Sequence, residues 1–198
     1  MIVVKFGGTS VGDAAAITRA AAIVESKLER RPMVVVSALG GATNALLAVG
    51  EQSAKGHLIG ALRGVETLRD RHLRECEALL AGTDDADEIA AELSAMFDEL
   101  AHLAEALSTL GHVTPRSLDA IASQGEQLSA HLVSAFFRKS GIDAEYVDPR
   151  TVMITDDCFM QAEPQTDRIA ERSRAVLLHE RLDLVSVGDV RGLLLPRA

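Results

Sequence analysis

Aromatic residues are scarce in this sequence: they make up 3% of its 198 residues, with one Tyr and no Trp. Proteins that bind single-stranded nucleic acid stack bases on aromatic side chains, so this function is not expected. The formal net charge of −9 also disfavours a nucleic-acid partner or an anionic membrane surface. An anionic small molecule is still compatible with this charge, because a binding site needs only local positive charge.

Cysteine and long apolar stretches are also scarce. The two cysteines, Cys76 and Cys158, lie far apart, and in a chain without an export signal we expect free thiols. No apolar run approaches the roughly 18 residues of a membrane span, and the first residues lack the basic and then apolar pattern of a secretory signal. We therefore expect a cytoplasmic protein with a core of ordinary size, since 47% of the residues are hydrophobic.

The first 39 residues predict a βαβ unit. A β-branched run at 2–6 stops at a Gly-Gly pair, a helical pattern starts at Asp13, and a second apolar run occupies 33–39. This order predicts parallel strands covered by helices, and we expect an α/β fold with three layers, α/β/α, and a mainly parallel sheet. The expected core of the sheet includes Val3, Val4, Val34, Val35 and Val36.

The middle of the chain is predicted to be helical, with helices at 61–80, from residue 89 onward and at 116–139, followed by strands at 143–147 and 182–187. The second of these helices carries a heptad-like seam, which we expect to pack against another helix of the same domain. The seam consists of Leu93, Met96, Leu100, Leu103, Leu107 and Leu110.

The segment Lys5-Phe6-Gly7-Gly8-Thr9-Ser10 is a candidate phosphate site. Glycine lets backbone N–H groups approach a phosphate closely, the following helix points its positive end at the same place, and lysine adds a full charge. The spacing fits neither a Walker A loop nor a dinucleotide fingerprint. Taken alone, the same residues could form an ordinary strand-to-helix turn.

A second candidate loop, Ser37 to Asn44, follows the second predicted strand. In a parallel sheet this loop leaves the carboxyl edge beside the first one, where ligands of α/β proteins bind. Ser37, Thr43 and Asn44 would supply hydrogen-bonding groups there. Alternatively, Thr43 or Asn44 caps the next helix, and both roles are compatible.

The helix at 116–139 contains a third candidate, Ser123-Gln124-Gly125-Glu126. Glycine inside a helix costs about 1 kcal/mol relative to alanine, so close packing or a ligand is expected to compensate. The apolar pattern by itself favours an exposed Glu126. Thr155-Asp156-Asp157 is interpreted as a turn.

No metal-binding set is predicted, because His72 and Cys76 on one helix face supply only two ligands. No nucleophile elbow for Ser/His/Asp catalysis is present either.

Taken together, these three motifs resemble the aspartate kinases of the amino-acid kinase family. The resemblance runs in order from Met1 to about Pro164 and includes Asp148-Pro149-Arg150 and Ala162-Glu163-Pro164. A helical insert at about 45–112 is similar to that of the lysine-sensitive and bifunctional types.

The resemblance implies that the enzyme uses ATP and Mg²⁺ to phosphorylate the side-chain carboxylate of L-aspartate, the first step of the lysine, threonine and methionine pathway. It implies a homo-oligomer with no nucleic-acid or membrane partner. Lys5, Phe6, Gly7 and Gly8 would bind the ATP phosphates, with Lys5 also catalytic. Ser37, Thr43 and Glu126 would bind aspartate, with Glu126 facing its ammonium group, and no residue is assigned as a metal ligand.

The sequence also departs from the family. In aspartate kinases a glycine-rich loop with an arginine and a Gly-Ser-Asp follows the fourth strand, then the adenine site and regulatory domains. Here Val187-Gly188-Asp189 leads only to Ala198, so we expect a partial catalytic domain over 1–198, truncated at its C-terminus and lacking the nucleotide-binding half. Cys158, Met160 and Gln161 stand where the family usually has Arg, Gly and Arg.

Two consequences of this truncation are expected. The isolated chain should have negligible kinase activity, and its last strand should lie at an unprotected sheet edge. The alternative function is a non-catalytic aspartate-binding remnant that associates with a full-length subunit. A glutamate or carbamate kinase is less well supported, given the Ser-x-Gly-Glu helix and the Thr-Asn pair.

Overall fold

The fold is built on a small parallel sheet. The computed structural model describes residues 2–177 and 185–188. The sheet contains strands β1 (Ile2–Phe6), β2 (Pro32–Val36), β3 (Glu145–Val147) and β4 (Val185–Gly188) in the order β1-β2-β4-β3. Every pairing is parallel, which confirms the predicted βαβ unit and the parallel sheet.

Strand β4 lies inside the sheet and not at its edge. It pairs with β2 through Met33–Val185 to Val36–Gly188 and with β3 through Glu145–Val185 to Val147–Val187. The prediction that the strand at 182–187 forms an unprotected edge is therefore wrong, although residues 182–184 lie outside the described residues. Because β4 has partners on both sides, it presents no unpaired sheet edge to another chain.

The sheet buries one face more completely than the other. Phe6, Val34 and Val36 are buried, whereas Val4 and Val35 are half-buried and Val3 is 66% exposed. The prediction of Val3 as a core residue is wrong, because side chains alternate between the two faces of a strand and Val3 lies on the opposite face from Phe6. A continuous apolar run does not reveal which face is covered.

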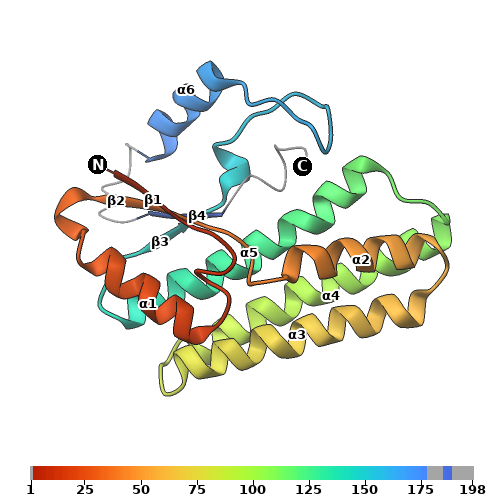
Figure 1. The fold of residues 1–198 in the computed structure, drawn as a ribbon, viewed down its shortest axis with the longest axis horizontal. Helices are drawn as coiled ribbons and strands as arrows, with labels where there is room; N and C mark the ends of the chain where they lie inside the picture. The colour runs from red at the N-terminus through yellow and green to blue at the C-terminus, as the bar shows by residue number, and fades with distance from the viewer. Residues whose placement is uncertain (1, 178–184, 189–198) are drawn as a thin grey trace.

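Helices cover both sides of the sheet (Figure 1). Helix α6 lies on one side, and α1 with the long helices α2 to α5 lies on the other, which gives the predicted three layers. The helices are α1 (Ala14–Glu25), α2 (Ala42–Ala54), α3 (Leu58–Leu80), α4 (Ala86–Leu110), α5 (Pro115–Lys139) and α6 (Thr166–Leu177), with short 3-10 turns at Leu28–Arg30 and Pro149–Thr151.

The helix starts follow their local sequence. Asp13 caps α1, as predicted, by accepting the N–H of Ala16 at 2.8 Å. Thr114 caps α5 by accepting the N–H of Ser117 at 3.1 Å, with Pro115 in the first turn. Both arrangements satisfy amide groups that a helix leaves without an internal partner.

The apolar face of α4 differs in part from the predicted seam. Leu93, Leu100 and Leu107 are buried as predicted, but Met96 and Leu103 are half-buried and Leu110 is 64% exposed. The α-helical repeat of 3.6 residues rotates a strict heptad away from its partner, so neighbouring positions share the contact. The buried face consists of Ile89, Leu93, Phe97, Leu100, Ala104 and Leu107.

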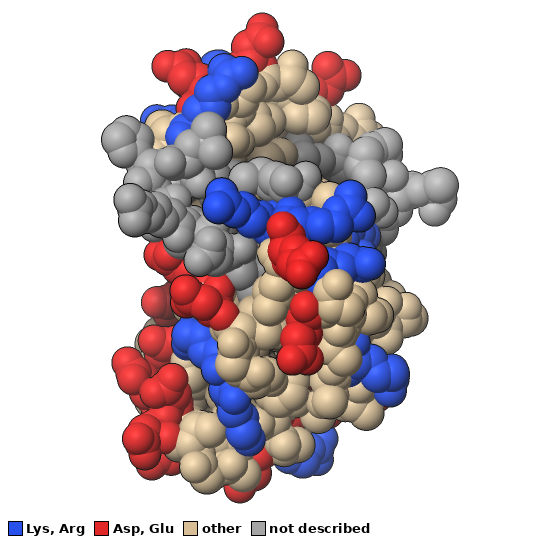
Figure 2. Space-filling view, turned by 90° about the vertical axis from the view of Figure 1, so that its left-hand side faces the viewer, with Lys and Arg blue, Asp and Glu red and all other residues tan. Residues whose placement is uncertain are grey.

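The outer surface carries both signs of charge. On the face seen in Figure 2, a band of basic side chains crosses the upper half, with acidic side chains beside and below it. Among the helices of the described residues, none is long and apolar enough to cross a membrane.

Candidate functional site

The carboxyl ends of the parallel strands place the predicted motifs at one edge of the sheet. Phe6 ends β1 and Val36 ends β2, and these two residues are partners in register. The N–H of Ser37 donates to the carbonyl oxygen of Phe6 at 3.0 Å, so the two loops leave the sheet side by side. Lys5 lies one residue before the end of β1, opposite Val35, and is exposed.

The two glycine-bearing loops are in close backbone contact. A Cβ added at Gly8 would lie 3.2 Å from the carbonyl oxygen of Ala38 and 4.0 Å from Ser37 Oγ. A Cβ added at Gly40 would lie 3.4 Å from the carbonyl oxygen of Gly8. These approaches are tight for any larger residue, and they explain why glycine occupies both loops.

Arg71 of α3 joins the same two loops. Its Nη1 donates to the carbonyl oxygen of Gly40 at 2.6 Å and its Nη2 to that of Gly12 at 2.8 Å. Sequence reasoning missed this residue, since nothing in the periodic pattern of α3 distinguishes Arg71 from the other arginines of the helix.

The two helices that follow these loops begin differently. The N–H groups of α1 already have carboxylate partners: Ala16 donates to Asp13, and Ala14 donates to Glu75 Oε2 at 2.6 Å. Helix α2 begins after Gly41, which has φ of 79° and no side chain to cap it. Its first turn is therefore the better receptor for an anion, because the positive end of its dipole has no capping side chain.

Thr43 and Asn44 lie in this first turn of α2. Because the capping position belongs to Gly41, the alternative that Thr43 or Asn44 caps the helix is wrong. Thr43 is half-buried and Asn44 is exposed. Their polar side chains therefore stand beside the uncapped start of the helix.

Helix α5 brings the third motif to the same place. A Cβ added at Gly125 would lie 3.0 Å from Ala38 Cβ and 3.0 Å from Leu46 Cδ1, so this glycine permits α5 to pack on the second loop and on α2. Glu126 is only 6% exposed. The expectation of an exposed Glu126 is wrong, because the contact at Gly125 buries this side of the turn.

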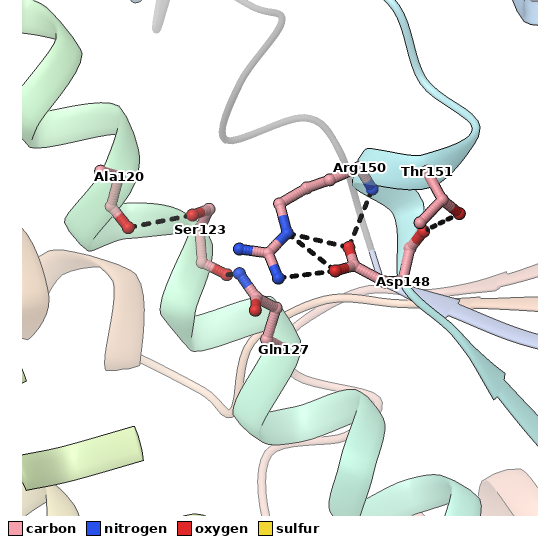
Figure 3. Close-up of polar contacts among 6 residues, drawn as sticks. All are labelled: Ala120, Ser123, Gln127, Asp148, Arg150 and Thr151. Atoms are coloured by element: carbon pink, nitrogen blue, oxygen red, sulfur yellow. Dashed lines mark hydrogen bonds and ion pairs between the residues drawn. The ribbon is translucent and has the colours of Figure 1, made fainter. Parts of the chain in front are cut away.

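An ion pair occupies the loop after β3, at the same edge of the sheet. Arg150 Nη2 lies 2.6 Å from Asp148 Oδ2, and Arg150 Nε lies 3.0 and 2.9 Å from the two carboxylate oxygens. Figure 3 shows this pair facing the turn of α5 that carries Ser123 and Gln127. Burial raises the pKa of Asp148, but the hydrogen bonds and the charge of Arg150 outweigh it and hold this pKa below its ordinary value.

Thr155 forms an antiparallel bridge with Pro164 and the chain turns between them, so the turn predicted at Thr155-Asp156-Asp157 begins only after Thr155. Asp156 Oδ1 accepts the N–H groups of Cys158 at 3.2 Å and Glu163 at 3.0 Å. The segment is tied to α5 because Asp119 Oδ2 accepts the N–H of Met160 at 2.8 Å. Burial raises the pKa of the Asp119 carboxyl, partly offset by that hydrogen bond.

A separate cavity of about 220 Å³ lies between α4, α5 and β3. None of the residues predicted for the site lines it, so we do not place the substrate there. It contains a close pair, since His131 Nδ1 lies 3.3 Å from Glu92 Oε2. Burial raises the pKa of Tyr146 in its wall to about 12. The lining residues are Asp85, Glu88, Ile89, Glu92, His131, Ser134, Arg138 and Tyr146.

The second loop thus contacts Gly8 of the first loop and Gly125 of α5, in both cases through Ala38. Arg71 joins the two loops through Gly12 and Gly40. Thr43 stands at the start of α2, and Glu126 is buried one residue from Gly125. That the Lys5 ammonium and the Glu126 carboxylate share one cleft stays a prediction. Within the described residues, no group of three or more His, Cys, Asp or Glu side chains could hold a metal ion.

A parallel sheet with glycine loops at its carboxyl edge and helices on both sides is the architecture of an α/β phosphate-binding protein. The chain matches the amino acid kinase family over residues 1–188. It belongs to that family.

Known relatives point to one branch of the family. The chain is 33% identical over 178 residues to the lysine-sensitive aspartokinase 3 of Escherichia coli, covering 90% of this chain and 37% of that protein. It is 30% identical to the chloroplastic bifunctional aspartokinase/homoserine dehydrogenase 1 of Arabidopsis thaliana, covering 88% of this chain and 20% of the relative. The chain therefore spans well under half of each relative.

Among solved structures, E. coli aspartokinase III in complex with aspartate and ADP superposes with a TM-score of 0.83 at 33% identity, covering 95% of this chain and 40% of that one. The resemblance to the aspartate kinases is confirmed by these matches.

Proposed function

We propose that this chain carries the aspartate-binding and phosphate-binding part of an aspartate kinase, which transfers the γ-phosphate of ATP to the side-chain carboxylate of L-aspartate. The observation that supports this most is that the loop after β2 contacts both the loop at Gly8 and Gly125 of α5 through Ala38. In this proposal the three motifs, which are distant in sequence, bind the two substrates of one reaction. A relative solved with aspartate and ADP supports the choice of ligands.

The proposed reaction needs positioning and positive charge rather than a general base. The attacking carboxylate is already ionised at neutral pH, and the difficulty lies in bringing two anions together. Lys5 supplies a full charge at the end of β1, and the amide groups of the loop at Gly7 and Gly8 would approach the phosphates. Preorganised donors of this kind stabilise the charge that develops during transfer.

On the aspartate side, the proposed site has hydrogen-bond donors and one carboxylate. Ser37 and Thr43 would donate hydrogen bonds to the substrate, and the uncapped start of α2 favours an anionic group beside Thr43. Glu126 would accept the substrate ammonium, which gives a buried carboxylate in a helix a chemical purpose.

Mg²⁺ is not assigned to residues of this chain. The described side chains form no group of three or more metal ligands that could hold the ion. Magnesium in phosphotransferases is commonly bound largely by the phosphate oxygens of the nucleotide.

Titration calorimetry with L-aspartate and with ATP tests the proposal directly. Aspartate should bind the wild-type chain, and Glu126→Gln, which keeps the shape and removes the charge, should weaken it at least tenfold. Glu51→Gln on the exposed side of α2 is the matched control and should bind normally. Equal affinity in Glu126→Gln and the wild type would contradict the assignment of Glu126.

The alternative function gives a different result in the same experiment. A non-catalytic remnant would bind aspartate weakly and ATP hardly at all, with no turnover in a coupled assay. A homo-oligomer, lysine-pathway membership and the status of 45–112 as an insert stay predictions of the proposed function.

A further inference from the structure

Two side chains of helix α3 make three hydrogen bonds with the candidate site, all to main-chain atoms. Arg71 donates to the carbonyl oxygens of Gly12 and Gly40 at 2.8 and 2.6 Å. One turn further along, Glu75 accepts the N–H of Ala14 at 2.6 Å. Arg71 and Glu75 are four residues apart and so lie on the same face of the helix.

The geometry points to Arg71 as a positioning residue that fixes the phosphate-side loop, residues 7–12, against the aspartate-side loop, residues 37–41. This inference rests on the proposed function, because it assigns those two loops to the two substrates. Arg71 is not proposed to contact the transferred phosphoryl group or the attacking carboxylate. It acts through the carbonyl groups of Gly12 and Gly40.

Arginine is suited to this task for a geometric reason. Its planar guanidinium carries donors in a rigid fork, so one side chain can hold two acceptors at a set separation. Lysine offers a point charge on a flexible stem and cannot reproduce the fork. Arg71 is half-buried, so solvent competes less for its hydrogen bonds than at the open surface.

The two loops also pack closely against each other at this point. A Cβ added at Gly40 would lie 3.5 Å from Gly12 Cα and 3.9 Å from Arg71 Nη2. The two carbonyl groups that Arg71 holds therefore belong to loops already in van der Waals contact. In-line transfer between two bound substrates depends on the spacing of the groups that hold them, and a displacement near 1 Å can cost about a hundredfold in rate.

Glu75 holds the far end of the phosphate-side loop. Its hydrogen bond from Ala14 fixes the first residue of α1, directly after the loop and its Asp13 cap. Together the two side chains of α3 fasten the loop at both ends of the segment 12–14. Of these two side chains, only Arg71 bridges the two loops.

The test combines a structural readout with a kinetic one. Hydrogen–deuterium exchange of peptides covering 7–14 and 37–44 is compared among the wild type, Arg71→Ala and Arg71→Lys, with Arg74→Ala as control. Arg74 is exposed on the same helix. Both Arg71 variants should exchange faster in both peptides, Arg71→Lys less so, and Arg74→Ala should match the wild type. Unchanged exchange in Arg71→Ala would overturn the inference.

Steady-state kinetics then separates positioning from simple stability. Because negligible activity is expected of the isolated chain, the kinetics are measured in a chain extended to the length of its aspartokinase relatives. There Arg71→Ala should lower kcat/KM by roughly tenfold or more, the loss expected for one charge-assisted hydrogen bond, mainly through kcat and with partial recovery in Arg71→Lys. Faster exchange with unchanged kinetic constants would overturn the positioning role. A wild type that binds neither aspartate nor ATP would refute the proposed function, and with it the positioning role, while the exchange result would still decide whether Arg71 holds the loops.

Discussion

His72 packs edge-on against Phe97, with ring centroids 5.2 Å apart and planes at 64°. Both side chains are fully buried between α3 and α4. His72 Nδ1 lies 2.8 Å from the carbonyl oxygen of Leu68, so the neutral ring donates from Nδ1. Nε2 has no hydrogen-bond partner among the residues that the structure describes. Burial is the main reason why the pKa of His72 falls from 6.5 to about 4.

This depressed pKa predicts acid sensitivity. Because the unfolded chain takes up the proton more readily than the folded one, the free energy of unfolding should fall as pH drops from about 6.5 to about 4. The shift corresponds to a loss on the order of 3 kcal/mol. His72→Leu should flatten this dependence in urea unfolding measured across that range. Exposed His102→Gln is the control, and an unchanged pH slope in His72→Leu would contradict the assignment.

Gly125→Ala is expected to disturb the site although alanine is the better helix former. The new methyl group would lie 3.0 Å from Ala38 Cβ, which is attached to the loop backbone and cannot rotate away. Overpacking of this kind typically costs about 1–3 kcal/mol, more than the roughly 1 kcal/mol gained in helix propensity. The variant should lose stability in thermal unfolding and bind aspartate more weakly.

Gly60→Ala is the matched control for this substitution. Its methyl group would meet only Oε1 of Gln52, the flexible end of an exposed side chain that can move aside. Equal stability of Gly125→Ala and the wild type would show that α5 does not rely on this contact.

Met160→Gly is expected to stabilise the chain. Met160 has φ of 68°, in the left-handed region that favours glycine. Removing the strain should raise the free energy of unfolding by about 1 kcal/mol, measured by urea denaturation. Gln161→Gly, at the next position without a positive φ, should destabilise slightly, and stabilisation by both variants would refute the backbone explanation.

In a version of this chain completed to the length of its aspartokinase relatives, Lys5→Ala is expected to lower turnover far more than stability. Lys5 is exposed near the end of an edge strand, so the core loses little. Loss of one donor to a transferring phosphoryl group typically costs on the order of 3 kcal/mol in the transition state. The measurements are kcat in a coupled assay and ATP affinity by calorimetry, with exposed Lys55→Ala as control. Near-normal turnover and ATP binding in Lys5→Ala would remove Lys5 from the mechanism.

Local signals in the sequence predicted most of the elements in their order, although helix α6 was not predicted. The Asp13 cap, the Gly-Gly stop after β1 and the apolar periodicity of α5 act over a few residues, so they can be recognised without knowing the fold. The βαβ order implied parallel strands, and parallel strands imply a shared carboxyl edge. For this reason the loops at Gly8 and Ser37 could be placed together from the sequence.

Tertiary structure decided what depends on contacts between distant segments. It exposed Val3, buried Glu126 through the contact of Gly125 with Ala38 and moved β4 to the interior of the sheet between β2 and β3. It also determined that Arg71, among the arginines of α3, donates hydrogen bonds to the two loops. Periodic patterns in the sequence cannot predict these features. The partner that covers a side chain, or accepts its hydrogen bonds, lies tens of residues away in the sequence, and tertiary packing determines which residue it is.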